Sequence, residues 1–177
     1  MECRGDAIVL IGFMGTGKSS VGRELARRTD LPRYDTDEMV SKRFRSPIAQ
    51  IFAERGEAVF RHAEAETLLE LPQDPAIIVT GGGLLLREGH VQKVRSFGTV
   101  VLLTAELETL VERLSRRASR PLLQTPDPRT TIEELLKARA PLYQCAADAE
   151  VDTTHRTHEE VAELVLAEVE RLRGDGN

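Results

Sequence analysis

Residues 12–19 read Gly-Phe-Met-Gly-Thr-Gly-Lys-Ser and match the Gly-x-x-x-x-Gly-Lys-Ser/Thr pattern in full. Glycines let the backbone bend so that successive N–H groups point into one concavity, which suits a phosphate group. In this pattern Lys18 reaches the β- and γ-phosphates of a nucleotide, and the Ser19 hydroxyl ligates Mg²⁺. A chance glycine-rich turn is the alternative, but the flanking strand and helix patterns are those that the chemistry requires. The residues expected at the nucleotide are Gly12, Gly15, Thr16, Gly17, Lys18, Ser19 and Ser20.

A pair of carboxylates, Asp35 and Asp37, follows the second apolar run of the chain. Ligands of open α/β sheets bind beyond the carboxyl ends of the strands, so both side chains are expected near the phosphates. One carboxylate can hold the water shell of a metal ion while the other accepts a proton from an attacking hydroxyl. The alternative is that one of them only caps the helix that follows, as Asp often does.

Three consecutive glycines, Gly81, Gly82 and Gly83, end a third apolar run. They expose backbone N–H groups and let a ligand approach closely, although a plain flexible turn has the same composition. Arg139 ends a helical stripe, which consists of Ile132, Leu135, Leu136 and Arg139. A guanidinium that points toward the protein body needs a partner and suits a carboxylate. The alternatives are an internal ion pair and a side chain that extends back to solvent. Arg61, directly after Phe60, is a second arginine on an apolar helix.

The segment 116–129 contains four arginines and three prolines with almost no periodicity, and we predict a long mobile loop there. A loop arginine such as Arg116, Arg117 or Arg120 can close over ATP and stabilise charge on the transferring phosphoryl group. A solvated basic loop is the alternative. The four histidines show no metal-binding spacing, and His155 and His158 are expected at the surface.

Strands and helices must alternate to position these residues. Strands are expected at 7–11, 31–34, 76–79, 99–103 and 150–151. Helices are expected at 18–29, 37–52 with an interruption at Pro47, 57–71, 107–114, 130–140 and 157–173. Capping-box patterns at Thr130–Glu133 and Thr157–Glu160 open the last two helices. This order predicts a single domain over residues 1–177, a three-layer α/β/α sandwich with a central parallel sheet, and a frayed tail at 174–177.

Composition narrows the class of protein. The 177 residues carry 24 Lys and Arg against 29 Asp and Glu, and this net charge of −5 argues against nonspecific binding to nucleic acid or to an anionic membrane. The sequence has no apolar run long enough to span a membrane and no signal peptide. Its two cysteines provide no disulfide framework, which indicates a reducing, cytoplasmic setting. A monomer is expected, because the sequence shows no long exposed apolar helix face that would need a partner to cover it.

Taken together, these residues resemble the shikimate kinase family over nearly the whole chain, from Ala7 to about Arg173. The resemblance rests on the following segments in order: IVLIGFMGTGKSSVGRELA, Asp35-x-Asp37, Phe60-Arg61 with Glu64, Gly81–Gly83, Arg120-Pro121-Leu122-Leu123, Arg139-Ala140-Pro141-Leu142-Tyr143 and Val151-Asp152-Thr153. It implies a P-loop kinase fold related to nucleoside-monophosphate kinases, with a mobile lid at about 116–129. It also implies an enzyme that phosphorylates the 3-hydroxyl of shikimate with ATP and Mg²⁺, a step in making aromatic amino acids.

The resemblance implies a role for each matching residue. Lys18 and Ser19 would bind phosphates and Mg²⁺, Asp35 would lie near Mg²⁺, and Asp37 would hydrogen-bond the substrate hydroxyl and accept its proton. Arg61 and Arg139 would hold the shikimate carboxylate, with Gly81, Gly82 and Gly83 lining the same pocket. The lid arginine that approaches the phosphates would be Arg120, and Arg156 would lie near the adenine. Two positions depart mildly from the common pattern of the family. Ser20 stands where Thr is frequent, and His62 stands where a basic residue is frequent.

Three other functions fit parts of the pattern. One is a P-loop kinase for another small acid such as gluconate, because paired arginines favour a carboxylate without distinguishing a ring from a chain. Another is a nucleotide-sensing module without catalysis, although such a module could lose Asp37 or the substrate arginines, which are all present here. The third, a nucleic-acid-associated ATPase, is disfavoured by the acidic charge and the scarcity of aromatic residues.

Overall fold

The computed structural model describes residues 4–116 and 126–174 of the chain. Within these ranges the strands are β1 (Ala7–Gly12), β2 (Arg33–Asp35), β3 (Ile77–Val79), β4 (Gly98–Thr104) and β5 (Ala149–Asp152). They form one sheet in the order β2-β3-β1-β4-β5, and every neighbouring pair is parallel. The central strand β1 is buried along its whole length, as its continuous apolar run predicts for a strand covered on both faces. The predicted central parallel sheet is therefore confirmed.

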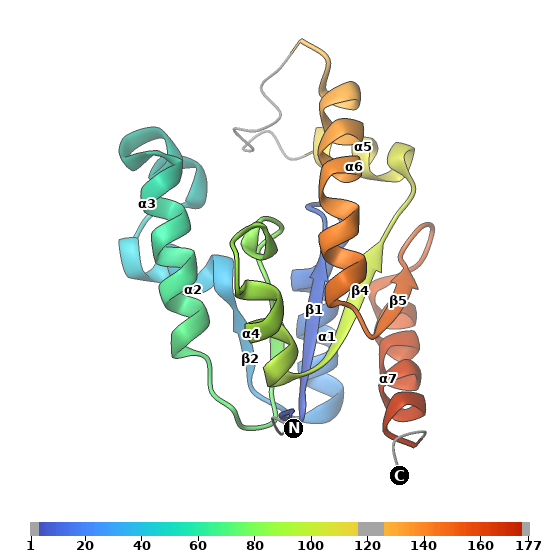
Figure 1. The fold of residues 1–177 in the computed structure, drawn as a ribbon. Helices are drawn as coiled ribbons and strands as arrows, with labels where there is room; N and C mark the ends of the chain where they lie inside the picture. The colour runs from blue at the N-terminus through green and yellow to red at the C-terminus, as the bar shows by residue number, and fades with distance from the viewer. Residues whose placement is uncertain (1–3, 117–125, 175–177) are drawn as a thin grey trace.

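Helices cover both faces of the sheet (Figure 1). They are α1 (Lys18–Thr29), α2 (Thr36–Phe44), α3 (Ile48–Glu70), α4 (His90–Phe97), α5 (Leu107–Ser115), α6 (Pro128–Ala146) and α7 (His158–Gly174), with a 3₁₀ turn η1 at Leu84–Leu86. Successive residues of β1 point to opposite faces, so Ile8 and Leu10 pack with α1 and α7 while Val9 and Ile11 pack with α4 and α6. The predicted three-layer α/β/α architecture is thus observed.

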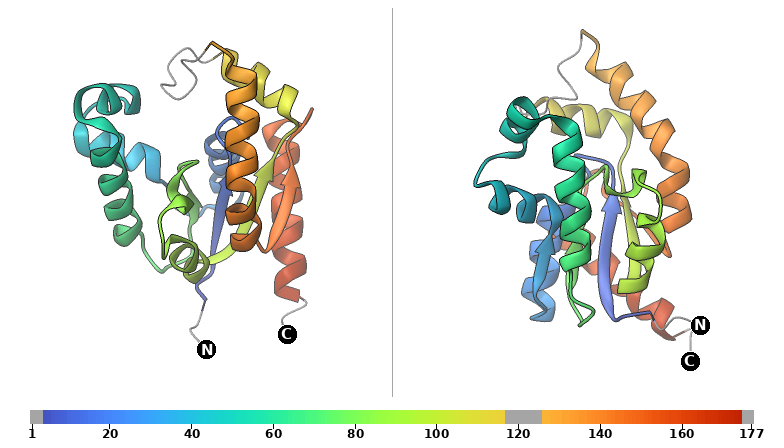
Figure 2. Two further views of the ribbon diagram at one scale, coloured as in Figure 1. Left: turned by 45° about the horizontal axis from the view of Figure 1, so that its top comes forward. Right: turned by 60° about the vertical axis from the view of Figure 1, so that its left-hand side comes forward.

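Helices α2 and α3 form a separate wall beside the β2 edge of the sheet (Figure 2). Val40, Ile51, Phe60 and Ala63 make a small apolar cluster between them. Gly56, with φ of 80°, breaks the helical geometry inside α3. The wall lies opposite α6 in both views of Figure 2, and the carboxyl ends of the strands lie between the two.

Several predicted boundaries differ from the structure. The helix expected over 37–52 is interrupted as predicted, because α2 ends at Phe44 and Pro47 precedes the first residue of α3. Helix α4 was not predicted, since its eight residues give too short a pattern. The capping box at Thr130–Glu133 was wrong: α6 begins at Pro128, and Asp127 accepts the Thr130 N–H instead. The box at Thr157–Glu160 is confirmed by reciprocal hydrogen bonds of 2.8 and 3.2 Å.

The expected lid falls mostly on residues 117–125, which lie outside the described residues. Its predicted end was wrong, because residues 128 and 129 belong to α6. At the other end of the chain α7 extends to Gly174, and residues 175–177 of the expected tail lie outside the description as well. Within residues 4–116 and 126–174, no helix is long and apolar enough to cross a membrane.

Candidate active site

The glycine-rich loop follows β1 directly and ends at the first residue of α1. Gly12 has φ of 137°, and a Cβ there would lie 2.3 Å from the Leu103 carbonyl oxygen, so this position requires glycine. Gly17, with φ of 90°, precedes α1 and opens the amino end of that helix toward the loop. Lys18 is buried, and its Nζ donates to the carbonyls of Gly12 and Phe13 at 2.8 Å.

A hollow of about 100 Å³ lies over this loop. Its lining includes Lys18, Ser19 and Ser20 from the loop and α1, together with Asp37 from α2. The hollow is predominantly polar in its lining, with a lysine ammonium and a helix amino end beside it, which is the environment that an anionic phosphate chain requires. Thr16 is buried below it, where its hydroxyl donates to the Phe13 carbonyl at 2.9 Å and keeps the loop in shape.

The two predicted carboxylates have different surroundings. Asp35 is buried at the end of β2 and caps α2, because its Oδ1 accepts from the N–H groups of Asp37 and Glu38 at 3.1 and 3.3 Å. The capping alternative is therefore correct for Asp35. Capping does not remove it from the site, since Asp35, Asp37 and Ser19 line a common groove at the surface. Asp37 is the second residue of α2, and it also lines the hollow over the loop.

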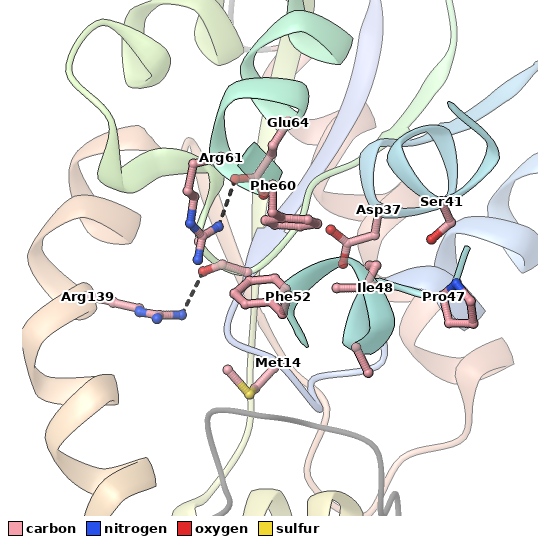
Figure 3. Close-up of a pocket in the computed structure, with 13 residues that line it drawn as sticks. Met14, Asp37, Ser41, Pro47, Ile48, Phe52, Phe60, Arg61, Glu64 and Arg139 are labelled. Atoms are coloured by element: carbon pink, nitrogen blue, oxygen red, sulfur yellow. Dashed lines mark hydrogen bonds and ion pairs between the residues drawn. The ribbon is translucent and has the colours of Figure 1, made fainter. Parts of the chain in front are cut away.

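A larger cavity of about 380 Å³ adjoins the hollow, and Met14, Asp37 and Gly82 line both (Figure 3). Apolar side chains from the α2–α3 wall form one side of it, among them Phe52 and Phe60, whose ring centroids lie 4.7 Å apart. Arg61 and Glu64 of α3, and Arg139 of α6, supply its charged groups. The structure thus brings Asp37, Arg61, Arg139 and two of the three predicted glycines to one cavity, as the sequence predicts.

Arg139 reaches this cavity from α6 and is buried. Its Nη1 donates to the Gly82 carbonyl at 3.1 Å, and its Cζ lies 5.5 Å from the centroid of the Phe13 ring. Tyr143, one turn further along α6, donates to the same carbonyl at 2.5 Å. These contacts fix the position of the guanidinium and leave it facing the cavity, as Figure 3 shows.

Arg61 of α3 lines the same cavity and is held by two carboxylates of its own helix. It pairs with Glu57 at 3.2 Å and with Glu64 at 2.8 Å, and it lies over the Phe60 ring at 5.3 Å. Burial raises the pKa of the Glu64 carboxyl, an effect that the nearby Arg61 opposes. Oε1 of Glu64 is buried and has no hydrogen-bond partner among the described residues.

Gly81 is the first glycine of the predicted triplet and lies beneath two carboxylates. A Cβ there would lie 2.5 Å from Asp37 Oδ1 and 2.5 Å from Glu64 Oε1. The Thr36 hydroxyl accepts from the Gly81 N–H at 2.8 Å and ties the glycines to α2. At Gly83 a Cβ would meet the Arg61 guanidinium at 2.5 Å. Gly81 and Gly83 therefore leave room for the charged groups that α2 and α3 bring against the backbone.

The sequence did not single out two residues beside the loop. Arg113 of α5 donates to Gly15 O at 3.4 Å and to Thr153 O at 2.7 Å, joining the loop to the segment after β5. The His158 ring lies 3.6 Å from the position of a Cβ on Gly17, so this exposed histidine borders the phosphate loop. The sequence around Arg113 or His158 does not indicate these contacts, because each residue belongs to an element far from the loop along the chain.

The structure gives less information about two residues that were predicted to contact the nucleotide, Arg156 and Arg120. Arg156 is partly exposed after β5 and pairs with Asp152 at 3.1 Å. Arg120 lies outside the described residues. Within the described ranges no group of three or more His, Cys, Asp or Glu residues is arranged to hold a metal ion.

The phosphate loop at the end of a central parallel strand, with a carboxylate between it and an arginine-flanked cavity, defines an ATP-dependent phosphotransferase of the P-loop kinase class. A family model described as shikimate kinase matches residues 14–170. A shikimate kinase from Thermodesulfovibrio yellowstonii is 43% identical over 166 residues, which are 93% of this chain and 95% of that protein. The chain therefore belongs to the shikimate kinase family, as its motifs predict.

Solved structures agree with this assignment. A shikimate kinase from Acinetobacter baumannii in complex with shikimate superposes with a TM-score of 0.86 at 33% identity, covering 93% of this chain and 92% of that one. A gluconokinase from Sinorhizobium meliloti, which covers 97% of this chain and 96% of its own, reaches a TM-score of only 0.55 at 19% identity. The second likeness shows the fold alone.

Proposed function

We propose that this chain transfers the γ-phosphoryl group of ATP to the 3-hydroxyl of shikimate, giving shikimate 3-phosphate and ADP. Family membership supports the reaction, and one observation carries the assignment of its site. Asp37 lines both the hollow over the phosphate loop and the cavity flanked by Arg61 and Arg139. A donor phosphate in the hollow and an acceptor acid in the cavity would therefore meet at this carboxylate.

The reaction is an in-line displacement at phosphorus. The substrate oxygen forms a bond to the γ-phosphorus, the bond to the β–γ bridging oxygen breaks, and ADP carries away the electron pair of that bond. Asp37 orients the attacking hydroxyl and takes its proton. Because phosphoryl transfer depends mainly on positioning and on neutralising charge, no covalent protein intermediate is needed.

The acceptor is held through its carboxylate. Arg139 and Arg61 line the cavity from two different helices, α6 and α3. A guanidinium binds a carboxylate with two parallel hydrogen bonds. The apolar rings of Phe52 and Phe60 complete one wall, against which the ring of the acid packs. On the nucleotide side, the loop glycines, Thr16, Lys18, Ser19 and Ser20 surround the phosphates, and Arg156 and Arg120 complete the ATP site.

Mg²⁺ is part of this proposal. The donors that Ser19, Asp35 and Asp37 offer in one groove are all oxygens, which Mg²⁺ prefers, and the metal keeps several of its waters. Ser19 would ligate the ion directly, and Asp35 would hold its water shell through the carboxylate that caps α2. Bound there, the metal would neutralise charge on the β- and γ-phosphates.

We also propose that the protein works as a monomer in the cytoplasm, with shikimate as its small-molecule substrate and without nucleic acid or membrane partners. The composition supports this setting.

The experiment is a measurement of ADP release with a panel of hydroxy acids: shikimate, quinate and gluconate. We expect shikimate alone to raise the rate above background hydrolysis, with phosphorus NMR detecting a single monophosphate ester. A higher kcat/KM with gluconate would overturn the choice of acceptor. Equal background rates with every acid would instead support a nucleotide-binding module without catalysis.

A further inference from the structure

A series of polar contacts joins α1 to Asp35 beside the groove that Ser19, Asp35 and Asp37 line, and Glu38 lines the same groove. Arg33 of β2 pairs with Asp35 Oδ2 at 3.3 Å and donates to Glu38 Oε2 at 2.6 Å. Arg23 of α1 reaches Glu38 Oε1 at 3.7 Å and donates to the Ser20 hydroxyl at 3.3 Å. Glu38 therefore uses each of its oxygens for an arginine from a different element.

This series of contacts runs from the interior of the protein to its surface. The side chains of Asp35 and Arg33 are 2% and 17% exposed, and those of Glu38 and Arg23 are 41% and 58% exposed. An exposed ion pair contributes little to the free energy of unfolding, because water and salt screen it. The contacts of Glu38 are therefore weak candidates for a role in stability. Their position is more informative, since they end on Asp35 at one side and on the phosphate-loop helix at the other.

We propose that Glu38 is a positioning residue for the nucleotide–metal site. It lies one residue after Asp37 and holds the 35–37 segment against α1 through Arg23, so the carboxylates keep their place beside Ser19. It also offsets the charge of Arg33, which would otherwise lower the attraction of Asp35 for a cation. This inference rests on the proposed function, because it concerns the binding of magnesium and nucleotide in that reaction.

Electrostatics makes the expected effect specific. Removing the charge of Glu38 leaves the two arginines with less negative charge around them. A metal-free nucleotide is a polyanion, so its affinity stays the same or rises. A cation beside Asp35 is repelled, so the affinity for the magnesium complex falls. A residue with a merely structural role would shift both affinities in the same direction.

The test compares wild type with Glu38→Gln by titration calorimetry with ADP, once with Mg²⁺ and once with a chelator. We expect the Kd of Mg·ADP to rise about fivefold and the Kd of metal-free ADP to stay level or fall, which is on the order of 1 kcal/mol of metal-dependent coupling. In steady-state kinetics kcat should fall by a similar factor, about fivefold, while KM for shikimate changes less than twofold.

Glu66→Gln is the matched control. Glu66 on α3 is also a half-exposed glutamate paired with an arginine, Arg43, but it does not line the hollow, the groove or the cavity. It should leave both affinities and kcat unchanged. In a double variant, Arg33→Met should restore part of the Mg·ADP affinity that Glu38→Gln loses, because it removes the positive charge that Glu38 offsets beside Asp35.

Equal shifts of both ADP affinities, or none, in Glu38→Gln would overturn the positioning role. That outcome is distinct from a failure of the proposed function, which would appear as wild-type protein that does not turn over shikimate. Thermal melting of both variants checks folding, and we expect midpoints within about 2 °C of wild type for such exposed changes.

Discussion

Asp37 and Glu64 come from different helices and meet over the same backbone position, where a Cβ on Gly81 would lie 2.5 Å from an oxygen of each. The absence of a side chain at this position lets α2 and α3 bring both carboxylates to the acceptor cavity. Gly81 is therefore a geometric requirement of the site, and its φ is not in the left-handed region that would otherwise demand glycine.

Gly81→Ala tests this relationship. The added methyl must displace at least one carboxylate, because an oxygen of each lies only 2.5 Å from its position. We expect kcat/KM for shikimate to fall by about 100-fold, close to 3 kcal/mol in transition-state stabilisation, while the affinity for ADP is retained. Gly174→Ala is the control, since a Cβ there meets nothing within 4 Å. Equal activity of the two variants would contradict the placement of Asp37 and Glu64.

Arg139→Lys tests how the acceptor is held. Lysine keeps the positive charge but loses the fork of donors that grips a carboxylate and also contacts Gly82 O. We expect KM for shikimate to rise by about 10- to 100-fold with KM for ATP unchanged within twofold. Lys137→Arg, a change on the exposed face of the same helix, serves as the control. If KM for ATP rose instead, Arg139 would belong to the nucleotide site.

Glu64→Gln tests the buried carboxyl. Burial raises the pKa of Glu64 above its ordinary value of 4.5, so in the pH window just above 4.5 the folded state binds more protons than the unfolded state. The contribution of Glu64 to the free energy of unfolding therefore falls as pH rises through that window and recovers as pH is lowered. Urea unfolding of wild type and variant between pH 4.5 and 8 measures the difference. The free energy of unfolding of wild type should increase relative to that of the variant as the pH is lowered.

The exposed Glu66 provides the comparison for that series. Glu66→Gln on the same helix removes an exposed carboxylate outside the cavity and should leave KM for shikimate unchanged. A Glu64→Gln difference that is constant with pH, or that favours wild type toward high pH, would contradict the raised pKa. The kinetic readout is separate: loss of the Arg61–Glu64 pair should raise KM for shikimate.

The sequence was most informative where function depends on neighbouring residues. The phosphate loop lies within eight consecutive residues, and the apolar runs at 7–11 and 76–79 have the composition of strands covered on both faces. The stripe that ends at Arg139 placed that guanidinium toward the protein body, and the structure confirms this orientation. Such features could be predicted because local geometry determines them.

Contacts between distant segments could not be predicted in this way. Arg113 reaches Gly15 across 98 positions of the chain, and His158 borders Gly17 although its own helix begins with an exposed turn. The contacts of Glu38 join β2, α2 and α1, and each of its partners reads as an ordinary charged residue in sequence. These relationships depend on the strand order of the sheet, which places the ends of β1 and β3 side by side.

The measurement that tests the central claim most directly is the turnover of Asp37→Asn with shikimate and ATP, beside wild type. Asparagine keeps the shape of the side chain but cannot accept the proton of the attacking hydroxyl. We predict that kcat falls by about 10²- to 10⁴-fold, while the Kd of ADP stays within about twofold of wild type. A variant that retains kcat within about tenfold, or roughly 1.4 kcal/mol, would contradict the role of Asp37 as the group that joins the two halves of the site.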